Sequence, residues 1–184
     1  MSALALNSAG LARRLPELRA GDRVLLSGVL YTARDAAHKR MFQLLDRGEP
    51  LPFALKGAVI YYAGPTPGQQ GMAVGACGPT TAGRMDAFAP RLLDLGLAAM
   101  IGKGERSQAV VDAIVRSGAC YFAAVGGAGA LIARCIRTAE VIAFDDLGCE
   151  SVKRMEVRDL PLTVAVDSRG NDLFRQGRAQ YEVI

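Results

Sequence analysis

Three glycine-rich turns each follow a short apolar segment of strand character, and they lie at residues 78–81, 102–104 and 126–129. Apolar runs predict buried strands, and apolar residues at helical spacing predict helices between them. The strands are expected at 58–63, 97–101 and 119–125, and the helices at 34–46, 83–95 and 107–117. Strands that alternate with helices predict an α/β layered domain with a central, mostly parallel sheet.

The two ends of the chain depart from that alternation. A β-rich stretch at 23–32 comes before the first helix, and late strands are expected at 140–144 and 160–166. A short strand at 72–77 and a short helix at 129–137 complete the prediction, and Pro90 is expected to kink the helix that contains it. At 184 residues the chain is long enough for one domain. We expect an N-terminal arm at 1–20 and a single domain at 21–184.

Composition narrows the classes of function. The chain is 51% hydrophobic and 22% charged, its net charge of +4 is dispersed, and it has no tryptophan. We therefore expect no nucleic-acid partner, and no apolar run approaches the ~20 residues of a membrane span. The cysteines form no C-x-x-C motif and lie at Cys77, Cys120, Cys135 and Cys149. They are typical of small buried residues in a reducing compartment, which favours the cytoplasm.

Cationic side chains lie close to the glycine-rich turns. In a parallel α/β sheet the turns after the strands open onto one edge, and ligands bind there. Arg34 begins a predicted helix, Arg84 comes four residues after Thr80, and Lys103 lies between two glycines. A helix N-terminus behind two of these turns would add a partial positive charge. Two guanidinium groups and an ammonium group at this edge suit a small polyanion.

Several familiar sites are excluded. The turn at 126–131 does not match the dinucleotide fingerprint, and the segment 96–104 does not match a P-loop. The single histidine, His38, reads as a partner of Asp35 on its own helix, and no self-contained zinc or iron–sulfur site is expected. The residues thus indicate a site that binds an anion, in a chain that has no strong catalytic group of its own. One alternative is a stand-alone module that binds a phosphate or a nucleotide at the Gly126 turn.

Six ordered sequence blocks carry a family resemblance. They are SGVLYTARDAAHKR (27–40), YYAGPTP (61–67), GPTTAGRMD (78–86), IGKG (101–104), FDDLGCES (144–151) and LPLTVAVDSRGN (160–171). Over residues 15–178 the chain resembles the β subunit of class I fumarate hydratase and L-tartrate dehydratase, which corresponds to the C-terminal half of single-chain class I fumarases. Cys149 departs from the pattern, because a small residue or proline is expected there.

The resemblance implies a swivelling β/β/α domain and a hydro-lyase activity. The reaction would be the reversible hydration of fumarate to (S)-malate, with L-tartrate dehydration and mesaconate hydration as alternatives. A 4Fe-4S cluster would be bound by a partner α subunit, and this chain would bind no cofactor or metal. A heterodimer or an α2β2 assembly is implied, with a homodimer possible for the isolated chain.

The resemblance also implies roles for single residues. Thr80 would carry the hydroxyl that transfers a proton, activated by surrounding cations and by a carboxylate from the α subunit. The substrate carboxylates would be clamped by Arg34, Arg84 and Lys103. The supporting residues are Asp35 and His38, which would orient Arg34, Thr81 as a helix N-cap, and Gly78 in the same turn.

Overall fold

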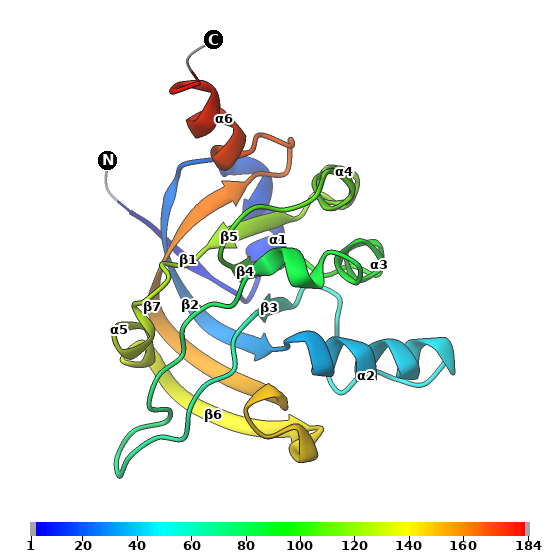
Figure 1. The fold of residues 1–184 in the computed structure, drawn as a ribbon, viewed down its shortest axis with the longest axis vertical. Coiled ribbons are helices and arrows are strands. Elements are labelled where there is room, and N and C mark those ends of the chain that lie inside the picture. Colours follow the sequence, from blue (N-terminus) through cyan, green and yellow to red (C-terminus); the bar gives the residue numbers. More distant parts are fainter. Residues whose placement is uncertain (1–2, 183–184) are drawn as a thin grey trace.

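The centre of the protein is a seven-stranded mixed sheet with strand order β1-β2-β3-β4-β5-β7-β6. The structure is a computed structural model that describes residues 3–182. The strands are β1 (Leu4–Asn7), β2 (Arg23–Thr32), β3 (Val59–Tyr61), β4 (Ala99–Gly102), β5 (Cys120–Ala123), β6 (Ile136–Ala143) and β7 (Val152–Val166). The α-helices are α1 (Leu11–Arg14), α2 (Asp35–Asp46), α3 (Ala89–Asp94), α4 (Gln108–Ser117), α5 (Gly129–Ala133) and α6 (Leu173–Ala179). Three 3₁₀ segments, η1 (Leu15–Glu17), η2 (Ala82–Met85) and η3 (Asp145–Glu150), complete the fold (Figure 1).

The strand pairing confirms the α/β class and shows that the sheet contains both parallel and antiparallel pairs. Strands β1 to β5 pair with their neighbours in parallel. The long strand β7 is antiparallel to β2, β5 and β6. Because β7 pairs with both β5 and β2, the strands β2, β3, β4, β5 and β7 form a closed ring. The central sheet is therefore mixed, with its five parallel strands β1 to β5 closed by the antiparallel strand β7.

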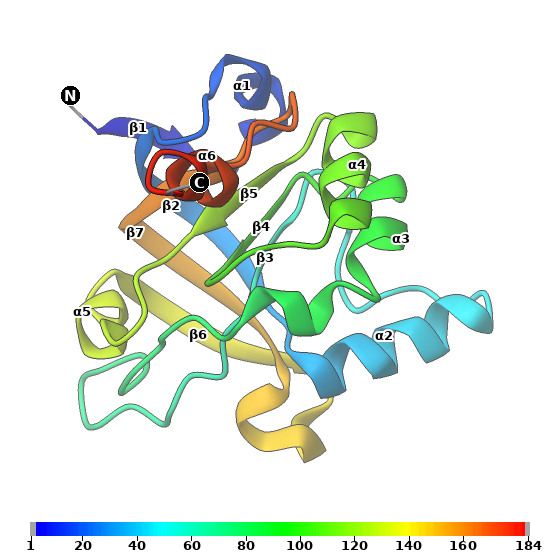
Figure 2. The same cartoon turned by 45° about the horizontal axis from the view of Figure 1, so that its top comes forward.

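Alternating side chains on the parallel strands build two hydrophobic cores. Tyr61, Ile101 and Phe122 point into a core shared with β1, β2 and β7. Met100 and Tyr121 point to the opposite face, which the helices α2, α3 and α4 cover (Figure 2). Each of these side chains is buried, and each such burial contributes about 1.5–3 kcal/mol. Burial on both faces explains why these strands read as continuous apolar runs.

The segment expected as an N-terminal arm is part of the first core. Strand β1 pairs with β2 in parallel. Leu6, Leu11, Leu15 and Leu18 are at most 5% exposed and pack in the same core as Tyr61. The arm expected at 1–20 is therefore wrong for the described residues 4–18. Removing these residues would expose the interior of the ring.

Several predicted elements have different bounds. Residues 72–77 form a loop rather than a strand, because their backbone is bonded within the loop, as in Gly75 N–H donating to Thr66 O at 3.0 Å. The helix expected at 83–95 is divided into η2 and α3, and Pro90 lies in the first turn of α3, where its missing N–H costs nothing. Helix α5 ends at Ala133, and β6 begins earlier than expected. None of the described helices is both long and apolar enough to cross a membrane.

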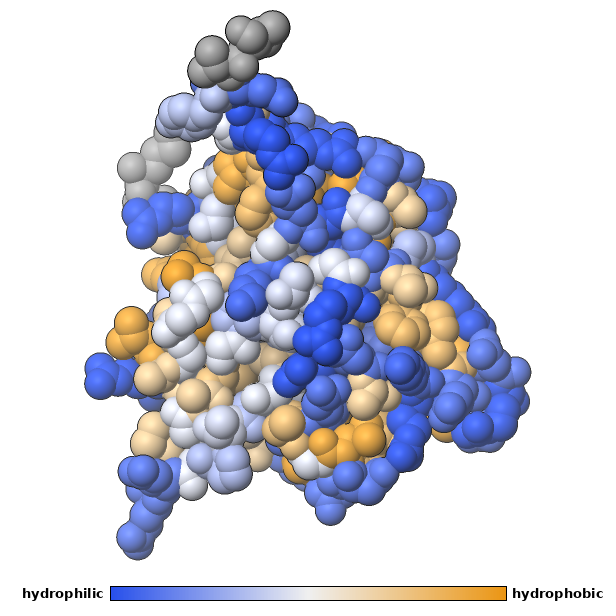
Figure 3. Space-filling model, viewed as in Figure 1, coloured by the Kyte–Doolittle hydropathy of each residue, from blue (hydrophilic) through white to orange (hydrophobic). Residues whose placement is uncertain are grey.

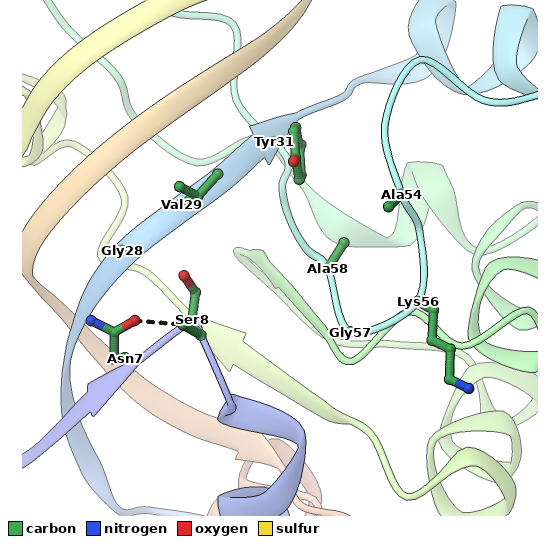
Figure 4. A pocket seen from close by; sticks show the side chains of 10 residues that line it. Asn7, Ser8, Gly28, Val29, Tyr31, Ala54, Lys56, Gly57 and Ala58 are labelled. Atoms are coloured by element: carbon green, nitrogen blue, oxygen red, sulfur yellow. Dashed lines mark hydrogen bonds between the residues drawn. The ribbon is translucent and has the colours of Figure 1, made fainter.

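A hollow opens where β2 changes neighbours. Strand β1 lies beside the first half of β2, and β3 lies beside its end. The space between them is about 310 Å³, and its lining includes Asn7, Ser8, Tyr31 and Lys56 (Figure 4). Gly28 is needed here because its φ is 106° and a Cβ would lie 2.3 Å from Ser8 Oγ. The lining contains none of the predicted site residues.

Candidate active site at the glycine-rich turns

The three glycine-rich turns meet at one edge of the sheet, as predicted. The N–H of Cys77 donates to Gly129 O at 3.0 Å, and a Cβ on Gly129 would lie 3.1 Å from Gly78 N. The Lys103 side chain runs past the third turn, since a Cβ on Gly126 would lie 3.5 Å from Lys103 Cδ. The missing side chains at these glycines thus allow the turns to pack directly on one another.

Thr80 is held between the ends of two parallel strands. Its N–H donates to Tyr62 O at 2.7 Å, and its carbonyl accepts from Lys103 N–H at 3.1 Å. The next residue, Thr81, forms a parallel bridge with Lys103. Thr80 is half-buried, and its backbone belongs to the sheet edge rather than to a helix. This pairing places the threonine next to Lys103.

The expected helix behind the threonines is a 3₁₀ segment of four residues, Ala82–Met85. Thr80 lies before it, so Thr80 and Arg84 do not share an α-helical face. Thr81 occupies the N-cap position but makes no capping hydrogen bond through its side chain. Thr81 is thus the N-cap residue by position, as predicted, without a stabilising bond from its hydroxyl. A helix dipole at this turn is correspondingly small, and the positive charge of the site comes from side chains.

Arg84 forms a two-point ion pair with Asp35. Its Nε donates to Asp35 Oδ1 at 3.0 Å, and its Nη2 lies 2.8 Å from Asp35 Oδ2. The pair joins η2 to the first residue of α2. The Arg84 side chain is 49% exposed, so this surface ion pair contributes about 0–1 kcal/mol to folding. An anionic ligand could therefore compete with Asp35 for the guanidinium at small cost.

Arg34 is positioned by Glu150, which the sequence interpretation missed. Arg34 Nη2 lies 3.2 Å from Glu150 Oε1, while Glu150 Oε2 accepts from Ala36 N–H at 3.1 Å. The guanidinium lies against the Gly64 backbone, where a Cβ would be 3.0 Å from Arg34 Nη1. Glu150 stands in the block FDDLGCES, but nothing local to that block shows that it reaches the start of α2.

His38 anchors the backbone of Arg34. The ring Nδ1 lies 2.9 Å from Arg34 O, and the ring packs against Tyr62 and Phe88 at centroid distances of 5.6 and 5.4 Å. Burial lowers the pKa of His38 to about 4, so the ring is neutral at pH 7. Asp35, predicted to act with His38 in orienting Arg34, pairs with Arg84 instead, whereas His38 does contact Arg34.

Lys103 differs from the two arginines. Its side chain is exposed, and no carboxylate within residues 3–182 forms an ion pair with it. Arg84 and Arg34 are linked through the adjacent Asp35, and Lys103 is linked to Thr80 through the backbone. These backbone and ion-pair links connect the segments that carry Arg34, Arg84, Thr80 and Lys103, and guanidinium and ammonium groups of this kind suit a compact anion with two carboxylates.

A protein-family model described as "Fumarase C-terminus" matches residues 1–177 of the chain. The chain belongs to the fumarase C-terminus family. This membership confirms the resemblance drawn from the six sequence blocks, which include the turns that meet at the site.

Curated relatives within the fumarase C-terminus family fall into two size classes. "Fumarate hydratase 2" of Leishmania major is 41% identical over 164 residues, which cover 88% of this chain and 29% of the relative. "Fumarate hydratase class I, aerobic" of Salmonella typhimurium is 40% identical, with 89% and 29% covered. The chain thus spans only 29% of the length of these two. "Putative L(+)-tartrate dehydratase subunit beta" of Methanocaldococcus jannaschii is 36% identical, with 87% and 85% covered.

The cysteines of this family member do not fit an iron–sulfur cluster. Within residues 3–182 no group of three or more His, Cys, Asp or Glu side chains could hold a metal ion. Burial raises the pKa of Cys77 to about 12 and that of Cys120 to about 12. Burial of this kind is typical of cysteines that pack in a core.

Proposed function

We propose that this chain is the β subunit of a heteromeric 4Fe-4S-dependent hydro-lyase that interconverts (S)-malate and fumarate. The observation that carries the proposal is the direct backbone bonding of the Thr80 turn to Lys103, next to the segment whose Arg84 pairs with Asp35. Membership of the fumarase C-terminus family supports it, as does the 85% coverage of a protein named as a dehydratase β subunit. We further propose that the fold is the swivelling β/β/α type, as one domain that includes β1.

In this proposal the cations bind and orient the substrate. Arg84 exchanges Asp35 for a substrate carboxylate, which matches the planar geometry of a guanidinium group. Arg34 keeps Glu150 as its support and presents its exposed edge to the second carboxylate. Lys103 is bonded to Thr80 through the backbone, and its ammonium is proposed to stabilise the charge that develops when a proton leaves the carbon next to a carboxylate.

Thr80 is proposed to move the proton. A threonine hydroxyl does not ionise near neutral pH, so it needs neighbouring positive charge and a base from outside this chain. The Lys103 ammonium supplies the charge, and the backbone bonds to Tyr62 and Lys103 fix the hydroxyl-bearing residue. General acid–base catalysis of this kind contributes about 10²–10⁴-fold. The cluster, bound by the partner subunit, would supply the chemistry of the hydroxyl group that leaves or is added.

We propose that the α subunit covers the face next to the third glycine-rich turn. Val125 and Leu131 flank this turn and are 70% and 63% exposed, and Met72 of the long loop is 45% exposed. Figure 3 shows hydrophobic surface over the region where Figure 1 places α5. Large exposed apolar side chains beside a charged site suit a protein interface. We propose that the two subunits form a heterodimer or an α2β2 tetramer. We also propose that this assembly is cytoplasmic.

The test is hydratase activity of the assembled enzyme. Co-expressed with its cluster-bearing partner under anaerobic conditions, the wild type should hydrate fumarate, and this chain alone should not. Thr80→Ala should lower kcat by about 10²–10⁴-fold without changing the yield of the complex. Thr138→Ala, an exposed threonine of β6, is the matched control. Activity of the isolated, iron-free chain, or a Thr80→Ala enzyme as fast as the control, would overturn the proposal.

A second candidate substrate is L-tartrate. The M. jannaschii relative named for tartrate dehydration matches this chain nearly end to end, whereas the fumarate hydratases are much longer. Comparing kcat/KM for fumarate, L-tartrate and mesaconate separates the candidates. A stand-alone nucleotide-binding module is disfavoured, because the Lys103 side chain and the Gly78 backbone already pack against the third turn.

A further inference from the structure

Arg106, which is not among the proposed substrate-binding residues, is buried beneath the glycine-rich turns. The Arg106 side chain is 0% exposed, and its Nε donates to Asp86 Oδ1 at 2.7 Å. Its guanidinium lies between two rings, 5.4 Å from the centroid of Tyr62 and 5.0 Å from that of Tyr121. Two aromatic faces and one carboxylate therefore hold a full charge inside the protein.

Both aromatic residues in contact with Arg106 bind a turn of the site. Tyr62 accepts the Thr80 N–H through its carbonyl at 2.7 Å. The Tyr121 hydroxyl donates to Gly104 O at 2.9 Å, next to Lys103. The guanidinium thus packs against Tyr62, which binds the turn that carries Thr80, and against Tyr121, which binds the turn that carries Lys103.

Asp86 adds a direct link between the same two segments. It follows η2, which carries Arg84, and its two oxygens bind the Arg106 side chain and the Ser107 N–H, the latter at 2.6 Å. Through Asp86 and the two tyrosines, one side chain joins the segment 80–86 to the segment 103–107. Small displacements of either segment would change the relative positions of Thr80, Arg84 and Lys103.

Stability alone gives a poor account of this arrangement. Arg106 Nη2 and the adjoining Tyr62 hydroxyl are buried and make no hydrogen bond of good geometry within residues 3–182, and a buried polar group left in that state costs about 1–3 kcal/mol. Buried ion pairs can often be replaced by apolar residues without loss of stability. A charge kept at this position is better explained by the geometry that it fixes.

We propose that Arg106 is a positioning residue for the hydro-lyase reaction, which holds the Thr80–Arg84 turn and the Lys103 turn in register. The proposal rests on the proposed function for its catalytic consequence. Its structural consequence, a fixed backbone at Thr80, does not depend on that function.

Arg106→Lys is the main variant. The lysine ammonium keeps the positive charge, but it is not planar, so it cannot stack between the rings of Tyr62 and Tyr121 while donating to Asp86 as the guanidinium does. In the assembled enzyme we expect kcat to fall about 10–100-fold, as expected for a misplacement of reacting groups by up to ~1 Å. Arg116→Lys is the control, since Arg116 pairs with Asp94 through two nitrogens on the exposed face of α4. The control should keep the wild-type kcat.

Two readouts separate positioning from a general structural effect. In a Thr80→Ala background, Arg106→Lys should lower the residual kcat by less than threefold, because residues that act through one another are not additive. Hydrogen exchange at the Thr80 amide, which is bonded to Tyr62 O, should become at least tenfold faster, whereas exchange in the β4 core should not change. Equal losses in both backgrounds, or unchanged exchange at Thr80, would overturn the proposal.

If Arg106→Lys does not fold, the milder Asp86→Asn keeps the stacked guanidinium and removes the ion pair, and the same criteria apply. A failure of the proposed function is recognised separately. In that case the wild-type complex lacks hydratase activity, yet the Thr80 amide still loses protection when Arg106 or Asp86 is changed.

Discussion

Gly102 is the point at which one added methyl group should disturb the site most directly. A Cβ there would lie 2.9 Å from Tyr62 Cδ2, 3.0 Å from Ala82 Cβ and 3.5 Å from Thr80 O. The Tyr62 ring cannot move away freely, because Arg106 packs against it. Overpacking of this kind costs about 1–3 kcal/mol. Since 1 kcal/mol shifts Tm by roughly 2–4 °C for a chain of this length, Gly102→Ala should lower Tm by about 2–12 °C.

The matched control makes the same chemical change in open space. Gly177 lies inside α6, and a Cβ there would meet nothing within 4 Å. Gly177→Ala should raise stability by about 0.5–1 kcal/mol, because alanine favours the helix, and Tm by about 1–4 °C. Both Tm values are measured by far-ultraviolet circular dichroism on the purified chain at pH 7. A Gly102→Ala protein that melts within about 1 °C of the wild type would refute the packing argument.

Three further predictions concern His38, Arg84 and the docking face. The folded-state pKa of His38 is about 4, below the unfolded value of about 6.5, so the unfolded state binds more protons as pH falls. Because of this group, the free energy of unfolding measured in urea should be about 2 kcal/mol lower at pH 5 than at pH 8. His38→Gln should abolish this difference between the two pH values. Arg84→Met should raise KM about 10–100-fold in steady-state assays of the complex, while the free energy of unfolding changes by under about 1 kcal/mol because the Asp35 pair is exposed. Leu131→Asp should reduce co-purification with the cluster-bearing subunit, whereas Leu95→Asp, on the exposed end of α3, should not; equal retention of the partner by both variants would contradict the proposed docking face.

The meeting of the second and third glycine-rich turns could be predicted, because they follow the neighbouring parallel strands β4 and β5. The first turn follows a loop rather than a strand, and its bonds to Tyr62 and Gly129 bring it to the same edge. Periodicity likewise located α2 and α4 to within a residue at each end. The partners of the charged side chains could not be predicted. Arg84 pairs with Asp35, 49 positions away, and Arg34 pairs with Glu150. Such pairs depend on which segments the sheet brings together, and no local pattern contains that information.

Arg106 shows the same limit in another way. It stands in the polar segment GERSQ, which is typical of an exposed turn. Its burial is caused by Tyr62, directly after β3, and Tyr121 of β5. The full length of β7 was missed for a related reason: its outward side chains are charged while Met155 and Val157 face the core. A half-exposed antiparallel strand with register shifts does not keep a strict two-residue alternation.

The ring of strands cannot close until β7 has been synthesised, because β7 pairs with both β2 and β5. Arg23 of β2 pairs with Thr163 of β7, so both segments must have left the ribosome before the ring can close. Until then β2 and β5 each present an unpaired edge, which is the kind of surface that recruits other chains. Contacts between such distant positions also slow folding. Loss of β7 should therefore yield an aggregating product rather than a smaller folded one, and the emerging chain should depend on chaperones or on early capture by its partner.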